Sequence, residues 1–143
     1  MINTMEKPVQ LERLAPRHYA WLELAPELLQ MAQQPGAHFS AIYDCHDCVG
    51  LVGVRAVGDT AELFVFINPP KSGRGYGTGA ARAMTCKTFC ELGYTRIYAD
   101  CLKGRAASRI MQKLGFVGTP KTENEMRYVL SKEGWVFEDA HED

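Results

Sequence analysis

The 143-residue sequence predicts a domain of the α/β (mixed α+β) class, with a central, mostly antiparallel sheet flanked by helices. Three observations lead to this prediction. Apolar runs within residues 38–67 are separated by turn residues, which is typical of a three-stranded antiparallel meander. A glycine-rich segment and a helical pattern follow, and a further strand pattern covers 95–102. Because a strand–helix–strand crossover joins parallel strands, strand 95–102 should run parallel to strand 60–67.

The N-terminal part of the chain predicts one strand and two short helices. Residues 7–14 carry Val9, Leu11 and Arg13 at every second position, as in a short strand. Pro16 suits the first turn of a helix, and apolar residues then continue with helical spacing to Met31. Pro26 interrupts that pattern, so we expect two helices in place of one.

The remaining elements follow in order along the chain. Strands are expected over 38–45, 48–57 and 60–67, and the first two are joined by Asp-Cys-His-Asp, which favours a turn. The crossover helix should cover 78–92 and end at Gly93, and the next helix should cover 106–114 and end at Gly115. Strands 117–120 and 125–130 form a closing hairpin. The acidic residues 138–143 predict a frayed tail after a single domain of residues 1–137.

Composition argues against several functional classes. The chain has 16 basic and 17 acidic residues and a net charge of −1, whereas nucleic-acid-binding domains are normally basic. No run is long and apolar enough to span a membrane, and residues 1–13 are too polar for a signal peptide. The five cysteines are odd in number and accompany no export signal. We therefore expect reduced thiols and a cytoplasmic protein.

The most informative stretch is the glycine-rich segment Ser72-Gly73-Arg74-Gly75-Tyr76-Gly77-Thr78-Gly79. Glycines allow backbone N–H groups to converge, and the start of a helix adds unpaired N–H groups and a positive dipole end. Such a turn binds phosphate oxygens. The spacing matches neither the P-loop, which needs Gly-Lys-Ser/Thr, nor the dinucleotide fingerprint Gly-x-Gly-x-x-Gly. A flexible glycine linker is the alternative interpretation.

This segment resembles the acetyl-CoA-binding loop of the GNAT superfamily of N-acetyltransferases. Ser72-x-x-Gly75-x-Gly77 is similar to the family's Gln/Arg-x-x-Gly-x-Gly/Ala, and Arg74-x-x-Gly77-x-Gly79 is an alternative register. A second similarity runs from Ser108 to Lys113-Leu114-Gly115-Phe116 and matches the family's Asn-x-x-Ser…Lys-Leu-Gly-Phe. The resemblance covers residues 59–116. It is nearest to the branch that acetylates protein N-termini and ribosomal proteins.

The resemblance implies a GNAT fold with a splayed parallel strand pair and acetyl-CoA as cosubstrate, and the placement of cysteines and histidines predicts no metal. It assigns Glu62 as the candidate general base, and a solvent-exposed strand glutamate is the alternative. Arg105 stands where the family has Asn, and Met111 stands where many members have a Tyr that protonates the leaving thiolate, so the general acid is unassigned. The implied cofactor-binding residues are Phe66, Ile67, Ser72, Gly73, Arg74, Gly75, Tyr76, Gly77, Thr78, Arg105 and Ser108.

The predicted activity is transfer of an acetyl group from acetyl-CoA to a primary amine by direct attack in a ternary complex. The acceptor could be a protein N-terminus, a lysine or a small-molecule amine, and a homodimer is left open. The alternative is a non-catalytic CoA-binding or protein-interaction module. Cys45-x-x-Cys48 together with Cys86 and Cys90 contains four thiols, but one pair belongs to a hairpin turn and the other to a helix, so we expect no zinc site.

Overall fold

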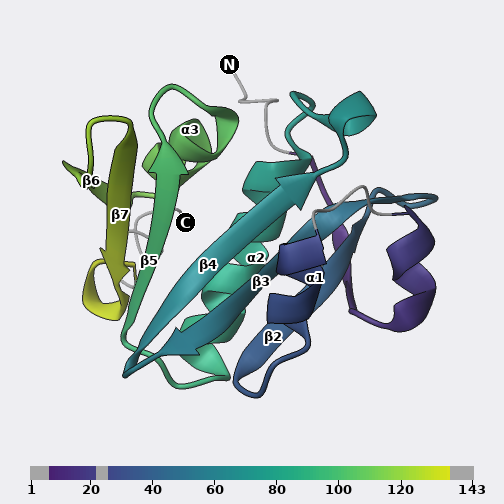
Figure 1. Ribbon diagram of the computed structural model, residues 1–143, viewed down its shortest axis with the longest axis horizontal. Coiled ribbons are helices and arrows are strands. Elements are labelled where there is room, and N and C mark those ends of the chain that lie inside the picture. Colours follow the sequence, from purple (N-terminus) through teal and green to yellow (C-terminus); the bar gives the residue numbers. More distant parts are fainter. Residues whose placement is uncertain (1–6, 22–25, 136–143) are drawn as a thin grey trace.

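A seven-stranded sheet forms the centre of the protein (Figure 1). The computed structural model describes residues 7–21 and 26–135. The strand order is β1-β2-β3-β4-β5-β7-β6, and every neighbouring pair is antiparallel except β4 and β5, which are parallel. This confirms the predicted mixed, mostly antiparallel sheet. The strands are β1 (Gln10–Arg13), β2 (Ala37–Tyr43), β3 (Cys48–Val57), β4 (Thr60–Ile67), β5 (Arg96–Leu102), β6 (Val117–Pro120) and β7 (Glu125–Ser131).

The helices lie in the connections that the sequence predicted. Pro26 begins a helix, as a residue with no N–H and a fixed φ can, and the segment before it is a 3₁₀ helix. The crossover helix starts at Tyr76, two residues before the expected Thr78, because Gly75 ends the turn in a left-handed conformation. The predicted tail 138–143 lies outside the described residues. The helical elements are η1 (Pro16–Trp21), α1 (Pro26–Ala32), η2 (Pro69–Lys71), α2 (Tyr76–Cys90) and α3 (Ala106–Lys113).

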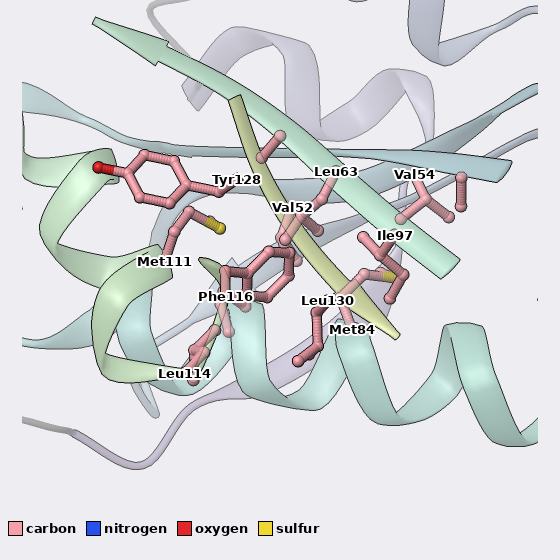
Figure 2. Close-up of a cluster of buried hydrophobic side chains, with 14 of the residues drawn as sticks. Val52, Val54, Leu63, Met84, Ile97, Met111, Leu114, Phe116, Tyr128 and Leu130 are labelled. Carbon is pink, nitrogen blue, oxygen red and sulfur yellow. The ribbon is translucent and has the colours of Figure 1, made fainter. Parts of the chain in front are cut away.

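The two faces of the sheet bury different sets of side chains. Helices α2 and α3 pack on one face and enclose the main core, part of which Figure 2 shows. Helix α1 packs on the other face against Phe39, Leu51 and Phe64. Side chains along β4 alternate between the two faces, as strand geometry requires. The labelled side chains of the main core in Figure 2 are Val52, Val54, Leu63, Met84, Ile97, Met111, Leu114, Phe116, Tyr128 and Leu130.

Parallel pairing of β4 with β5 is confined to the start of β4. Only Ala61↔Ile97 and Glu62↔Tyr98 are in register, although β4 continues to Ile67. In Figure 1 the two strands start together and then diverge, and α2 begins just beyond the far end of β4. The predicted splay is therefore present. It leaves one backbone edge of β4 unpaired with β5 beyond Glu62.

Candidate functional site

The glycine-rich segment forms a tight turn between β4 and α2. Gly73 has φ +77° and Gly75 has φ +90°, backbone conformations that side chains other than glycine rarely adopt. Gly75 is the N-cap of α2 and supplies no side chain to the first turn. The N–H groups of the first turn of α2 therefore remain available for a ligand. The linker alternative is wrong, because the segment connects two packed elements through a defined turn.

A cavity of about 330 Å³ opens beside this turn. Its walls come from β4, the turn with the first residues of α2, and α3. Among the predicted cofactor-binding residues, the lining includes Ile67, Ser72, Gly73, Gly75, Tyr76, Gly77 and Thr78. The other lining residues are Val65, Lys71, Ala106, Ala107, Arg109, Ile110 and Lys113.

Four predicted cofactor-binding residues do not line this cavity. Phe66 points to the opposite face of the sheet from Val65 and Ile67. Ser108 is buried, and its hydroxyl lies 2.5 Å from the hydroxyl of Tyr128. The other two are Arg74 and Arg105, and Arg105 is the N-cap residue of α3.

Gly77 shows why the cavity needs a glycine in the first turn of α2. A Cβ at this position would lie 2.8 Å from Cδ1 of Ile110, 3.5 Å from Ile67 and 3.8 Å from Val65. All three neighbours line the cavity. The missing side chain thus lets α2 approach both β4 and α3 and keeps the cavity open.

Three cations line the cavity and make it suitable for an anion. They are Lys71 at the end of η2, and Arg109 and Lys113 from α3, at positions four apart on one helical face. They add to the positive end of the α2 dipole. Sequence reasoning missed them, although the spacing of the two α3 cations was a usable signal.

Asp44 braces the turn from the β2–β3 hairpin. Its carboxylate accepts hydrogen bonds from the backbone N–H groups of His46 and Asp47, at 3.1 and 2.9 Å. Nζ of Lys71 and the hydroxyl of Tyr76 each lie 3.4 Å from the same side chain. The backbone hydrogen bonds, followed by the contact with Lys71, lower the pKa of Asp44 to about 2. Two cavity-lining residues are thereby held by one ionised group.

Glu62 occupies the last parallel pair before the splay, on the face opposite the cavity. Only 8% of the residue is exposed, so the alternative of a solvent-exposed strand glutamate is wrong. Nε of Arg55, directly opposite on β3, donates a 2.9 Å hydrogen bond to Oε1 of Glu62. The guanidinium of Arg55 also lies 5.7 Å from the ring centroid of Phe64. The side chain of Glu62 is therefore fixed in position by Arg55, beside the point where β4 and β5 separate.

A polar network continues from Glu62 across β5 and β7. Burial, together with the charge and hydrogen bonding of Glu62, raises the pKa of Tyr98. The guanidinium of Arg127 lies 4.5 Å from the Tyr98 ring centroid and donates two hydrogen bonds to Asp100, at 2.8 and 2.9 Å. Nζ of Lys121 lies 2.7 Å from the same carboxylate. The hydrogen bonds from Arg127, and then Lys121, lower the pKa of Asp100.

Comparison with known proteins decides the family. A family model described as "Acetyltransferase (GNAT) domain" matches residues 6–117. The chain belongs to this GNAT acetyltransferase family. The resemblance predicted from the turn and from the Lys-Leu-Gly-Phe segment is thereby confirmed, and so is the assignment to the acetyltransferases. No curated protein sequence matches the chain significantly.

Solved structures share the fold of this GNAT domain. Variant forms of the spermidine/spermine N-acetyltransferase SpeG from Vibrio cholerae align with a TM-score of 0.76 at 14% identity, over 92% of this chain and 98% of theirs. The Vibrio cholerae spermidine N-acetyltransferase in complex with CoA and spermine aligns with a TM-score of 0.75 at 14% identity, over 90% of this chain and 98% of that one. A probable acetyltransferase aligns with a TM-score of 0.65 at 19% identity, over 77% of this chain and 70% of that one. The nearness to the ribosomal-protein branch stays a prediction.

Metal-ligand clusters and membrane-spanning helices are absent from the described part of the chain. Within residues 7–21 and 26–135, no group of three or more His, Cys, Asp or Glu side chains is arranged to hold a metal ion. In the same part of the chain, no helix has the length and apolar character needed to cross a membrane.

Proposed function

We propose that this GNAT domain transfers the acetyl group of acetyl-CoA to a primary amine, and that the cavity beside the glycine turn holds the pyrophosphate of acetyl-CoA. The observation that carries the proposal is the convergence of the α2 N-terminus with Lys71, Arg109 and Lys113 on one cavity. Backbone N–H groups and flexible cations are the groups that bind phosphate oxygens. Because Gly77 has no side chain, space for the phosphate oxygens remains between α2 and its neighbours.

The splay suggests where the rest of the cosubstrate would lie. Beyond Glu62, backbone N–H and C=O groups on one edge of β4 have no partner in β5. An extended amide-containing chain such as pantetheine can satisfy such groups in the manner of an added strand. We assign this role to the backbone of Phe66 and Ile67, so the side chain of Phe66 need not line the cavity.

Glu62 is our candidate general base, acting directly or through a water molecule. The amine loses a proton, its nitrogen forms a bond to the thioester carbon, and the C–S bond breaks to release a thiolate that takes up a proton. Glu62 lies at the end of the parallel pairing, on the face where an acceptor could approach without passing the phosphate cavity. Arg55 donates a hydrogen bond to Oε1 of Glu62, and the carboxylate also interacts with Tyr98, so both partners orient the proposed base.

The acceptor is a primary amine on a protein or a small molecule. The similar Vibrio cholerae protein is a spermidine/spermine N-acetyltransferase, and one of its structures is a complex with CoA and spermine, which supports a small-molecule amine as the acceptor here. Met111 cannot protonate the thiolate, because a thioether has no proton to give and the residue is 1% exposed. We therefore assign this proton to solvent.

Two measurements on the purified chain test the proposal. Calorimetric titration with CoA tests the cavity, and release of free CoA thiol from acetyl-CoA in the presence of an amine panel tests the activity. The panel should contain polyamines, amino acids and peptides with free N-termini or lysines. CoA binding without turnover would favour the non-catalytic module, whereas failure to bind CoA would refute the cavity assignment.

A further inference from the structure

The five cysteines differ sharply in exposure and surroundings. Cys101 is buried, which raises the pKa of its thiol to about 11. Cys48 is half-buried, burial raises the pKa of its thiol, and its Sγ is directed at the carbonyl oxygen of Gly50 at 3.8 Å. Cys45 is exposed at the hairpin turn. Cys86 and Cys90 are both exposed on α2, and their sulfurs are 4.0 Å apart.

The separation of 4.0 Å suits a bridging atom better than a direct bond. A disulfide needs sulfurs about 2.05 Å apart, which two residues one turn apart reach only by distorting the helix. A centre that binds two thiolates with bonds of about 2.3 Å holds them about 3.4 Å apart at the pyramidal angle of trivalent arsenic, and about 3.8 Å apart at a tetrahedral angle. Chelation on α2 therefore requires the two sulfurs to move together by only about 0.2–0.6 Å.

We propose that Cys86 and Cys90 form a dithiol site for a soft, thiophilic centre that is satisfied by two thiolates, of which trivalent arsenic bearing one organic group is the chemical type. The site begins ten residues after the start of α2, about 15 Å from the phosphate turn, and does not depend on acetyl transfer.

A two-thiolate site selects against ions that need more ligands. In the described parts of the chain, no third His, Cys, Asp or Glu joins this pair in an arrangement that could hold a metal ion. Zinc usually takes four protein ligands in structural sites, so two thiolates alone do not make a zinc site. An arsenical with one organic group needs only two sulfurs.

The reaction with phenylarsine oxide shows how the site would be loaded. Two thiols displace the oxygen of the arsenical, two As–S bonds form, and the oxygen leaves as water with the two thiol protons. Arsenic stays trivalent and neither sulfur is oxidised, so the step needs no further reactant. The product is a ring closed through one turn of α2.

Phenylarsine oxide provides the test on the full-length, reduced protein. Native mass spectrometry should show one phenylarsenic group bound per chain, with the mass of one water lost. Cys86→Ser and Cys90→Ser should each weaken binding by about 10²-fold or more, because the second thiolate then no longer acts at high effective concentration. The matched control, Cys45→Ser with Cys48→Ser, removes the other closely spaced pair and should bind as the wild type does.

Four results would overturn the proposal. The first is unchanged phenylarsine oxide binding in Cys86→Ser and Cys90→Ser. The second is loss of binding in the Cys45/Cys48 control, which would place the dithiol at the hairpin. The third is tight, stoichiometric binding of zinc chloride, which would mean that further ligands complete the site. Circular dichroism should show no loss of helix on binding, since unwinding of α2 would contradict a preformed site.

Discussion

Replacing Gly77 by Glu is the sharpest test of the phosphate cavity. Gly77 lies inside α2, where a residue with a Cβ is favoured over glycine by about 1 kcal/mol. The close contact of the new Cβ would be with Cδ1 of Ile110 at 2.8 Å, the end of a flexible side chain. Ile67 and Val65, at 3.5 and 3.8 Å, are at ordinary contact distances. The helix preference offsets part of the cost of fitting a larger side chain at this buried position, so we expect the free energy of unfolding to fall by about 1–2 kcal/mol.

The effect of Gly77→Glu on the ligand should be much larger. Its carboxylate would enter the cavity lined by Lys71, Arg109 and Lys113 and compete for the same cations as a phosphate. Placing like charges together costs several kcal/mol, and about 3 kcal/mol corresponds to about a 10²-fold loss of affinity for CoA. Gly77→Gln is the matched control, since it adds the same volume without the charge and should lose less.

Calorimetric titration with CoA measures the affinity, and thermal unfolding of the same samples establishes that each variant is folded. The expected order of affinity is wild type, then Gly77→Gln, then Gly77→Glu. A folded Gly77→Glu variant that binds CoA with undiminished affinity would refute the assignment. Equal losses in the two variants would show that the space at Gly77 matters and that the charge of the cavity does not.

Three other changes have defined expectations. Glu62→Gln should lower turnover by about 10²-fold and leave the affinity for CoA unchanged. The turnover of the variant should recover at high pH, where the amine is already deprotonated. Full activity of the variant at neutral pH would refute the assignment of Glu62 as the base. Asp44→Asn should lose at most about 2 kcal/mol of unfolding free energy in urea at pH 7. Because folding lowers the pKa of Asp44 from 3.8 to about 2, this stabilisation is present above pH 4 and disappears as the pH falls towards 2, so wild type and variant should converge there. Met111→Tyr should destabilise the fold by about 1–3 kcal/mol in urea, because Met111 is fully packed; wild-type stability with faster turnover would show that the core has room for a phenol acid.

The sequence by itself determined the elements and the glycine-rich turn. Strands β3, β4 and β6 have the predicted bounds, because their apolar runs end at residues with strong turn preferences. The glycines of the turn were identifiable because positive φ values at Gly73 and Gly75 are a local backbone requirement. Parallel pairing of β4 with β5 followed from the single helical crossover between them.

Tertiary structure alone decided which side chains meet. The rotation of α3 turns Arg109 and Lys113 to the cavity and Ser108 to Tyr128, and that rotation is set by packing against β5, β6 and β7. The contact of Asp44 with Lys71 joins segments 27 residues apart. The burial of Glu62 depends on the length of parallel pairing, which local periodicity does not encode. Partners of this kind arise from register and helix rotation, which are fixed by the whole core at once.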